Sequence, residues 1–289
     1  MPYVYLISTV LCLSSYSIFV SIYNRKNSDK KDISGLYSLI CLTSGFLFWL
    51  VLFLIDGTYD FSVLPYSLLF AVCFGVCNIA NVMAYKVGSI VLTSLISQLS
   101  LIGVSCWGFI FWGSKITHLV IIGLVLVAVA LWLCLYKGKE KESKKINLTW
   151  IICVTLAFVG NAGCTIVQRT QQMNFNGEYA EFLMVVATAC ATLLGLVNYL
   201  RSDKRDSKVI IKTSGYLPVL AAIFNGLVNL FVILLVSTTL SPSLIYPVIA
   251  VGSLAITTVF SKFVFKEQMR WWQWLGVLVG AIAVGILSI

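Results

Sequence analysis

The chain has 289 residues, of which 60% are hydrophobic and only 11% are charged, and its net charge is +9. An ordinary soluble domain carries about 25% charged residues, and a water-soluble chain of this length could not cover so much apolar surface. The composition therefore predicts an integral membrane protein and excludes a cytosolic enzyme, a disordered chain and a secreted disulfide scaffold.

Ten stretches are apolar enough, over about 20 residues each, to cross a bilayer as helices. In chain order they are Tyr3–Ile22, Gly35–Ile55, Leu64–Tyr85, Ser89–Trp112, Leu119–Tyr136, Leu148–Val167, Phe182–Leu200, Leu217–Leu240, Leu244–Phe265 and Trp271–Ile289. Continuous apolar runs favour helices, because membrane-spanning β-strands alternate apolar with polar residues. The predicted fold class is an all-α integral membrane protein with ten transmembrane helices.

The basic residues are distributed unevenly between the two sides of the predicted spans. Only Lys115 and Arg169 lie on the side that follows the even-numbered spans, and the other 18 basic residues follow the odd-numbered spans. Because Lys and Arg are enriched in cytoplasmic loops, both termini are predicted to lie outside the cell membrane, whether plasma or inner. This pattern explains the positive charge without a nucleic-acid partner.

The two halves of the chain match at nearly constant offsets. The matches include Leu64–Pro65 with Leu217–Pro218, Ser100 with Ser253, Gly75 with Gly226 and Asn78 with Asn229. Five spans per half would invert the second half, and equivalent loops indeed carry opposite loads of basic residues. We therefore predict a first five-helix repeat over residues 1–137, a basic cytoplasmic linker over 138–147 and an inverted second repeat over 148–289.

The end of the second half shows a proline-containing span, an acidic residue, a short turn and a glycine-rich closing helix. These features are Pro242, Pro247, Glu267 and the segment from Gly276 to Gly285. With its five-plus-five arrangement, the chain resembles the EamA-like ten-helix branch of the drug/metabolite transporter (DMT) superfamily. In the first half, Ser114 stands where the acidic residue is expected. The resemblance implies alternating-access transport of small solutes and implies no particular substrate.

Polar residues inside spans indicate a pathway, because they are costly in lipid unless they are paired or face a cavity. The candidates are Asn78 and Asn81 in span 3, Ser97 and Gln98 in span 4, Asn161 in span 6, and Asn225 and Asn229 in span 8. We predict that they bind substrate in a cavity lined by spans 1, 3, 4, 6, 8 and 9, with Tyr16 and Tyr246 as aromatic walls. The alternative is hydrogen bonding between helices, at roughly 0.6–2 kcal/mol per bond.

No acidic residue lies deep in a predicted span. This pattern argues against a buried carboxylate that exchanges a proton for a cation, although Glu181, near the outer end of span 7, is the nearest candidate. A small polar or zwitterionic solute, read by amides and hydroxyls, fits best. An organic cation held by the rings of Tyr16, Trp107 and Tyr246 is the alternative.

Three further features lie near the C-terminus. Lys262 is expected to extend to the cytoplasmic interface. Glu267 corresponds to the family's acidic landmark and has a gating or structural role, or else forms a surface ion pair of little energy. The pair Gly276 and Gly280 permits close helix approach, either within a monomer or in a homodimer.

The remaining classes of function are excluded by what the sequence lacks. A single histidine, His118, excludes a site with two histidine ligands, and the nine cysteines lie in apolar runs, so no metal or other cofactor is expected. An intramembrane enzyme would need paired aspartates or a Ser–His pair within the spans. We predict a secondary active transporter rather than an enzyme, with the lipid bilayer and a small-molecule substrate as partners. A channel or a lipid flippase is the alternative.

Overall fold

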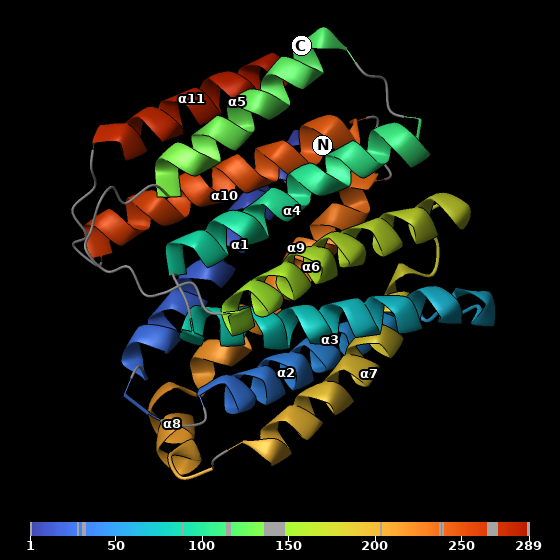
Figure 1. The fold of residues 1–289 in the computed structure, drawn as a ribbon. Coiled ribbons are helices and arrows are strands. Elements are labelled where there is room, and N and C mark those ends of the chain that lie inside the picture. The colour runs from blue at the N-terminus through green and yellow to red at the C-terminus, as the bar shows by residue number, and fades with distance from the viewer. Residues whose placement is uncertain are drawn as a thin grey trace.

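A computed structural model describes residues 2–27, 29–30, 33–87, 90–113, 117–135, 148–202, 204–236, 238, 240–264 and 271–287. Across these ranges the chain folds into helices and contains no strand (Figure 1). The helices are α1 (Pro2–Lys26), α2 (Ile33–Asp56), η1 (Phe61–Val63), α3 (Leu64–Val87), α4 (Ile90–Phe111), α5 (His118–Leu135), α6 (Leu148–Asn174), α7 (Ala180–Arg201), α8 (Ser207–Ser214), α9 (Tyr216–Val236), α10 (Pro242–Val264) and α11 (Trp271–Leu287). The predicted all-helical class is confirmed.

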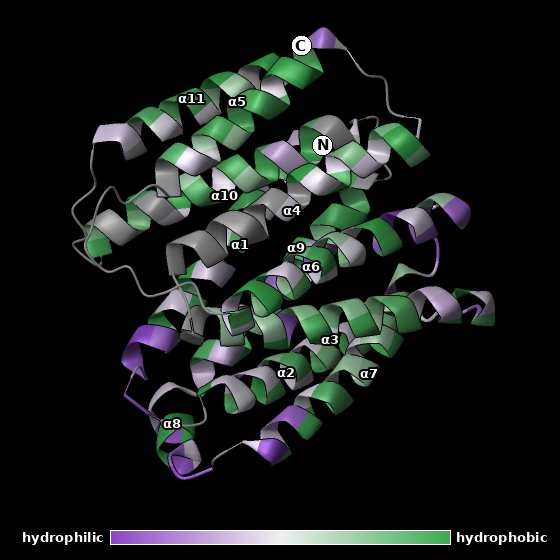
Figure 2. Cartoon of the chain, viewed as in Figure 1, coloured by the Kyte–Doolittle hydropathy of each residue, from purple (hydrophilic) through white to green (hydrophobic). Residues whose placement is uncertain are grey.

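Six helices are long and apolar enough to cross a membrane, namely α1, α2, α3, α6, α7 and α9. Shorter apolar stretches lie in α4, α5, α10 and α11. Figure 2 shows that hydrophobic residues cover the bodies of the helices and hydrophilic residues collect at their ends. This arrangement is compatible with a multi-pass membrane protein, because a helix in lipid satisfies its own backbone hydrogen bonds.

Two helical segments extend beyond the sequence prediction. Helix α6 continues seven residues past Val167, through a polar stretch that hydropathy assigned to a loop. Asn174 at its end donates a 2.7 Å hydrogen bond to the Tyr66 hydroxyl. The short helix α8 lies in a predicted loop and buries Ile210 completely. Hydropathy detects where apolar residues stop, whereas a helix can continue into polar residues because its hydrogen bonds are made by the backbone.

The helices pack as antiparallel pairs, of which α3 with α6, α2 with α7, α1 with α9, and α5 with α11 make the most extensive contacts. Further contacts join α3 to α7, α2 to α9, α1 to α10, α4 to α6 and α4 to α10. Helices α5 and α11 lie together along one edge of the bundle, and α2 and α7 lie towards the opposite edge (Figure 1). The helices between these two edges are α1, α3, α4, α6, α9 and α10.

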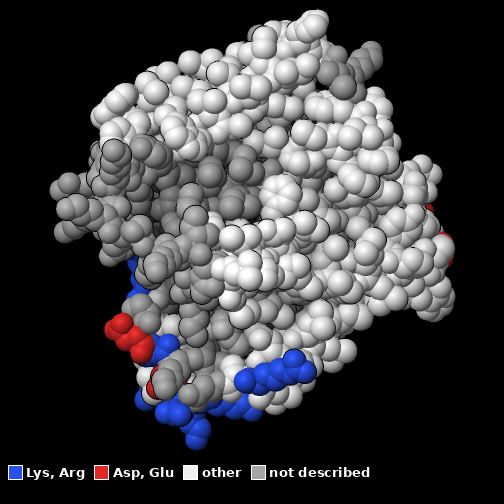
Figure 3. Space-filling view, viewed as in Figure 1, with Lys and Arg blue, Asp and Glu red and all other residues white. Residues whose placement is uncertain are grey.

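Charged residues gather at the two ends of the bundle (Figure 3). We call one end the basic end: it comprises the C-terminal ends of α1 and α7 together with α8, including Lys26, Lys30, Arg201, Lys204 and Lys212. The opposite end, the acidic end, carries Asp60, Glu178 and Glu181. Between them, the face seen in Figure 3 is free of described charged side chains, which matches the apolar belt of a membrane protein.

Candidate functional site

The predicted amides of α3 and α9 are all half-buried. Asn81 donates to the Cys77 sulfur at 3.3 Å, and Asn229 donates to the Asn225 backbone carbonyl at 2.8 Å. Both of these bonds lie within a single helix, so they do not hold two helices together. The Oδ1 atom of Asn78 is buried and accepts no hydrogen bond from the described residues.

The predicted polar residues of α4 and α6 meet at one contact. Asn161 donates to the Ser100 hydroxyl at 2.6 Å, and this bond joins α6 to α4. The helix-pairing alternative therefore describes this bond of Asn161. Ser97 and Gln98 belong to α4, but their side chains lie outside the described part of the structure.

The predicted aromatic walls do not meet. Tyr16 packs against a cluster at the basic end that includes Tyr23 and Tyr37. Tyr246 is 1% exposed and belongs to a different cluster, which also contains Leu6 of α1 at the acidic end. Trp107 stacks on Phe111 with 4.0 Å between ring centroids and is 38% exposed, so its face is already covered by a neighbouring ring.

Sequence reasoning missed Arg169, which hydropathy had placed in a loop. It lies in α6, three residues after Ile166 and seven after Ala162, so the three share a helix face. Ile166 and Ala162 pack against the acidic-end cluster that contains Tyr246. The guanidinium carbon of Arg169 lies 5.0 Å from the centroid of the Trp112 ring. The positive charge of Arg169 also interacts electrostatically with the Tyr246 hydroxyl.

Several buried polar atoms of Arg169 and of residues near it have no hydrogen-bond partner. Its Nε and Nη1 atoms, the Tyr246 hydroxyl and the Nε2 atom of Gln168 are all buried and make no hydrogen bond to described residues. Arg169 also forms no ion pair with a described carboxylate. The sequence signal for this site was present, because Ala162, Ile166 and Arg169 follow a helical spacing that continues past the apolar run.

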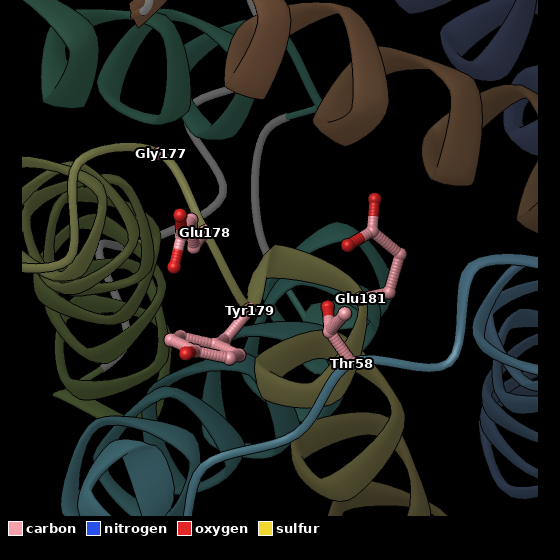
Figure 4. Close-up of a pocket in the computed structure, with 5 residues that line it drawn as sticks. All are labelled: Thr58, Gly177, Glu178, Tyr179 and Glu181. Carbon is pink, nitrogen blue, oxygen red and sulfur yellow. The ribbon is translucent and has the colours of Figure 1, made fainter.

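A pocket of about 350 Å³ opens at the acidic end and is lined by Thr58, Gly177, Glu178, Tyr179 and Glu181. In Figure 4, Glu178 and Tyr179 lie on one side of the pocket, and Thr58 and Glu181 lie on the other. The Glu178 carboxylate raises the pKa of the Tyr179 hydroxyl. Glu181 lies in the first turn of α7, where the helix dipole favours a negative charge. Glu181 therefore lies at the end of α7 rather than deep within it.

Two further predicted features lie outside the description. These are the side chain of Lys262 and the whole of Glu267. Among the described residues, no group of three His, Cys, Asp or Glu side chains could hold a metal ion.

Comparisons with known proteins bear on the fold alone. No protein-family model and no curated protein sequence matches the chain. A crystal structure of another protein superposes with a TM-score of 0.74 at 10% sequence identity, over 99% of this chain and 96% of that chain. At this identity the likeness shows that the same arrangement of helices exists in a solved protein, and it carries no information about function.

Proposed function

We propose that this chain is a ten-span secondary transporter of the EamA-like branch of the DMT superfamily, built from two inverted five-helix repeats. In this proposal α1–α5 correspond in order to α6, α7, α9, α10 and α11. The acidic end lies outside the cell, as does the N-terminus. The substrate is a small polar or zwitterionic solute, and an organic cation is the alternative.

The observation that carries the proposal is an exchange of helix contacts under this correspondence. The pair α3 with α6 exchanges with α9 with α1, and α3 with α7 exchanges with α9 with α2. The pair α1 with α10 exchanges with α6 with α4, whereas α2 with α7, α4 with α10 and α5 with α11 each map onto themselves. Such a pattern is what a two-fold axis through the bundle would produce, and inverted repeats are related by an axis in the membrane plane.

Matched glycines support the same correspondence. A Cβ atom on Gly75 of α3 would lie 2.6 Å from Leu194 of α7, and a Cβ atom on Gly226 of α9 would lie 2.6 Å from Phe48 of α2. The glycines therefore permit equivalent close approaches, because small residues let membrane helices pack tightly. The two contacts exchange when the halves exchange.

A pair of polar contacts follows the same rule. Asn161 of α6 bonds the Ser100 hydroxyl of α4, and Ser14 of α1 bonds the Ser253 carbonyl of α10 at 3.4 Å. Ser100 and Ser253 are separated by the repeat offset of 153 residues. Ser14 lies 12 residues after the start of α1, and Asn161 lies 13 residues after the start of α6. In both cases the first helix of one repeat bonds the fourth helix of the other repeat.

In an alternating-access cycle, the two halves would move against each other at these contacts. The six helices α1, α3, α4, α6, α9 and α10 include every predicted substrate-binding residue. Rocking of one half against the other would open the space between them first to one side and then to the other. The unpaired Oδ1 of Asn78 and the unpaired hydroxyl of Tyr246 offer substrate contacts that need no other hydrogen bond to break.

Flux through sealed vesicles tests the proposal. Purified protein in proteoliposomes is preloaded with amino acids, organic acids or quaternary amines, and counterflow of the labelled compound is measured. Saturable counterflow of one compound is the expected result. Ohmic conductance without saturation would mean a channel, and scrambling of labelled lipid without solute flux would mean a flippase.

A further inference from the structure

Arg169 of α6 is half-buried, and the burial of two of its nitrogens poses a physical problem that the amides do not. A guanidinium in a low-dielectric interior is stable only when its charge and its N–H groups are compensated. Arg169 has two buried nitrogens without hydrogen bonds and no ion pair to a described carboxylate. The Trp112 ring at 5.0 Å offsets part of the charge through a cation–π contact but accepts no hydrogen bond from Nε or Nη1.

Extension to the membrane surface does not explain this arginine. An arginine that extends to the interface places its nitrogens in water or among lipid headgroups. Here Nε and Nη1 are buried within the protein, between the ends of α4, α6 and α10. These three helices belong to the central six, so these two nitrogens lie against the interior of the bundle, while the residue as a whole is half-buried.

The tyrosine beside the arginine adds a second, independent observation. Tyr246 is 1% exposed, and its hydroxyl has no hydrogen-bond partner among the described residues. Buried hydroxyls are almost always paired. The neighbouring Arg169 guanidinium can only donate to this hydroxyl, so the O–H group and the guanidinium N–H groups have no acceptor among the described residues, and one shared acceptor would satisfy both. A group that accepts from both N–H and O–H donors, and that carries negative charge, is a carboxylate or a phosphate.

We propose that Arg169 and Tyr246 form an oxyanion-binding subsite, with Trp112 beneath the guanidinium, that recognises the carboxylate or phosphate group of a small solute. This inference rests on the proposed transport function and narrows its substrate class. An anionic or zwitterionic solute satisfies both donors, whereas an organic cation without an oxyanion would be repelled by Arg169. The subsite lies towards the acidic end, which is the outer end in the proposed topology.

The chain offers variants that separate binding from packing. Arg169→Gln removes the charge, Arg169→Lys keeps the charge but loses the planar fork, and Tyr246→Phe removes only a hydroxyl. Tyr37→Phe is the matched control, because Tyr37 is also about fully buried with an unpaired hydroxyl but lies in the basic-end cluster. All variants are made in the full chain and purified in the same detergent.

The experiment measures thermal unfolding of each protein against rising concentrations of sodium benzoate, sodium glutamate, glycerol phosphate and tetramethylammonium chloride. Sodium chloride at equal ionic strength is the reference. Ligand that binds the folded state raises the melting temperature with its concentration, so each titration yields an affinity. Protection by the carboxylates and protection by glycerol phosphate both support the subsite, and they identify which oxyanion it prefers.

The expected result is that an oxyanion protects the wild type and Tyr37→Phe equally. Arg169→Gln should weaken its affinity by at least about tenfold and Tyr246→Phe by about threefold, since charge-assisted hydrogen bonds contribute more than neutral ones. Arg169→Lys should fall between the wild type and Arg169→Gln. If Arg169→Gln does not fold, the comparison of Arg169→Lys and Tyr246→Phe with Tyr37→Phe decides.

Three results would overturn the subsite. They are no oxyanion protection of the wild type, equal protection in all variants, or protection by tetramethylammonium chloride equal to that by the oxyanions. Counterflow of a protecting anion in proteoliposomes then separates the two proposals. Protection that depends on Arg169, without counterflow, would support the subsite and contradict the transport proposal. Saturable counterflow of a solute at the same rate in the wild type and in Arg169→Gln would support the transport proposal and contradict the subsite.

Discussion

The two ends of this bundle differ in whether their charged and polar side chains have hydrogen-bond partners. At the basic end, Lys26 donates to the Thr213 carbonyl at 2.6 Å, and Lys30 donates to Asn27 at 3.1 Å. Asn27 in turn donates to the Ser214 hydroxyl at 2.9 Å, which ties the end of α1 to α8. At the acidic end, Arg169 has a tryptophan face but no hydrogen bond for Nε or Nη1.

The unpaired groups at the two ends also differ in kind. The basic end leaves the hydroxyls of Tyr37 and Ser38 without described partners, and both are neutral. An unpaired neutral group costs about 1–3 kcal/mol, and a charged one costs more. The lysines of the basic end therefore have hydrogen-bond partners, and only neutral hydroxyls are left without one there, whereas the acidic end leaves two nitrogens of a charged guanidinium without a partner.

The largest expected effect concerns which side of the membrane each end faces. Cysteine at Thr58, at the acidic end, should react fully with an impermeant reagent on intact cells, and cysteine at Lys208 in α8 should react only after permeabilisation. Both positions are exposed, so accessibility within the protein is matched. The reverse pattern would place the arginine subsite on the cytoplasmic side.

The next effect concerns the cost of the unpaired charge. Arg169→Met keeps an unbranched, flexible side chain and removes the charge, so the protein without ligand should become more stable by about 1–4 kcal/mol. The same variant should lose protection by oxyanions, as expected where function is held at the expense of stability. The measurement is thermal unfolding with and without benzoate. A lower melting temperature without ligand would mean that Arg169 serves packing.

A substitution at the basic end should lower the stability of the protein, whereas Arg169→Met should raise it. Asn27→Ala removes the link between α1 and α8 and leaves the buried Ser214 without its asparagine partner, which should cost about 1–3 kcal/mol of stability. Oxyanion affinity should stay unchanged, because α8 lies at the other end of the bundle. Asn24→Ala, one turn away on the same helix, is the control and should unfold like the wild type.

The smallest effect concerns the amides between the two ends. Asn78→Ala and Asn229→Ala should each weaken solute binding about threefold, since a lost hydrogen bond typically costs about 0.5–1.5 kcal/mol. Neither amide bonds another described helix, so melting temperatures should change little. Asn161→Ala is the contrast, because it breaks the bond to Ser100 and should lower stability. Unchanged affinity in the first two variants would remove them from the site.

The helices could be predicted from the sequence to within a few residues, because each apolar run must form a helix if it lies in lipid. The boundary failed only at α6 and α8, where polar side chains continue or begin a helix. The candidate site was predicted less well. Asn161 was identified as important, but Arg169 was counted only as a charge on one side of the membrane.

The sequence by itself determined the helical class, the apolar bodies of the helices and the charged character of their ends, since these depend on composition along a single chain. Only the tertiary structure decided which helices pair and which buried groups find partners. Arg169 and Tyr246 lie 77 residues apart in the chain. Their proximity depends on how α6 packs against its neighbours, and a hydrogen bond that is missing can be recognised only after every neighbour is in position.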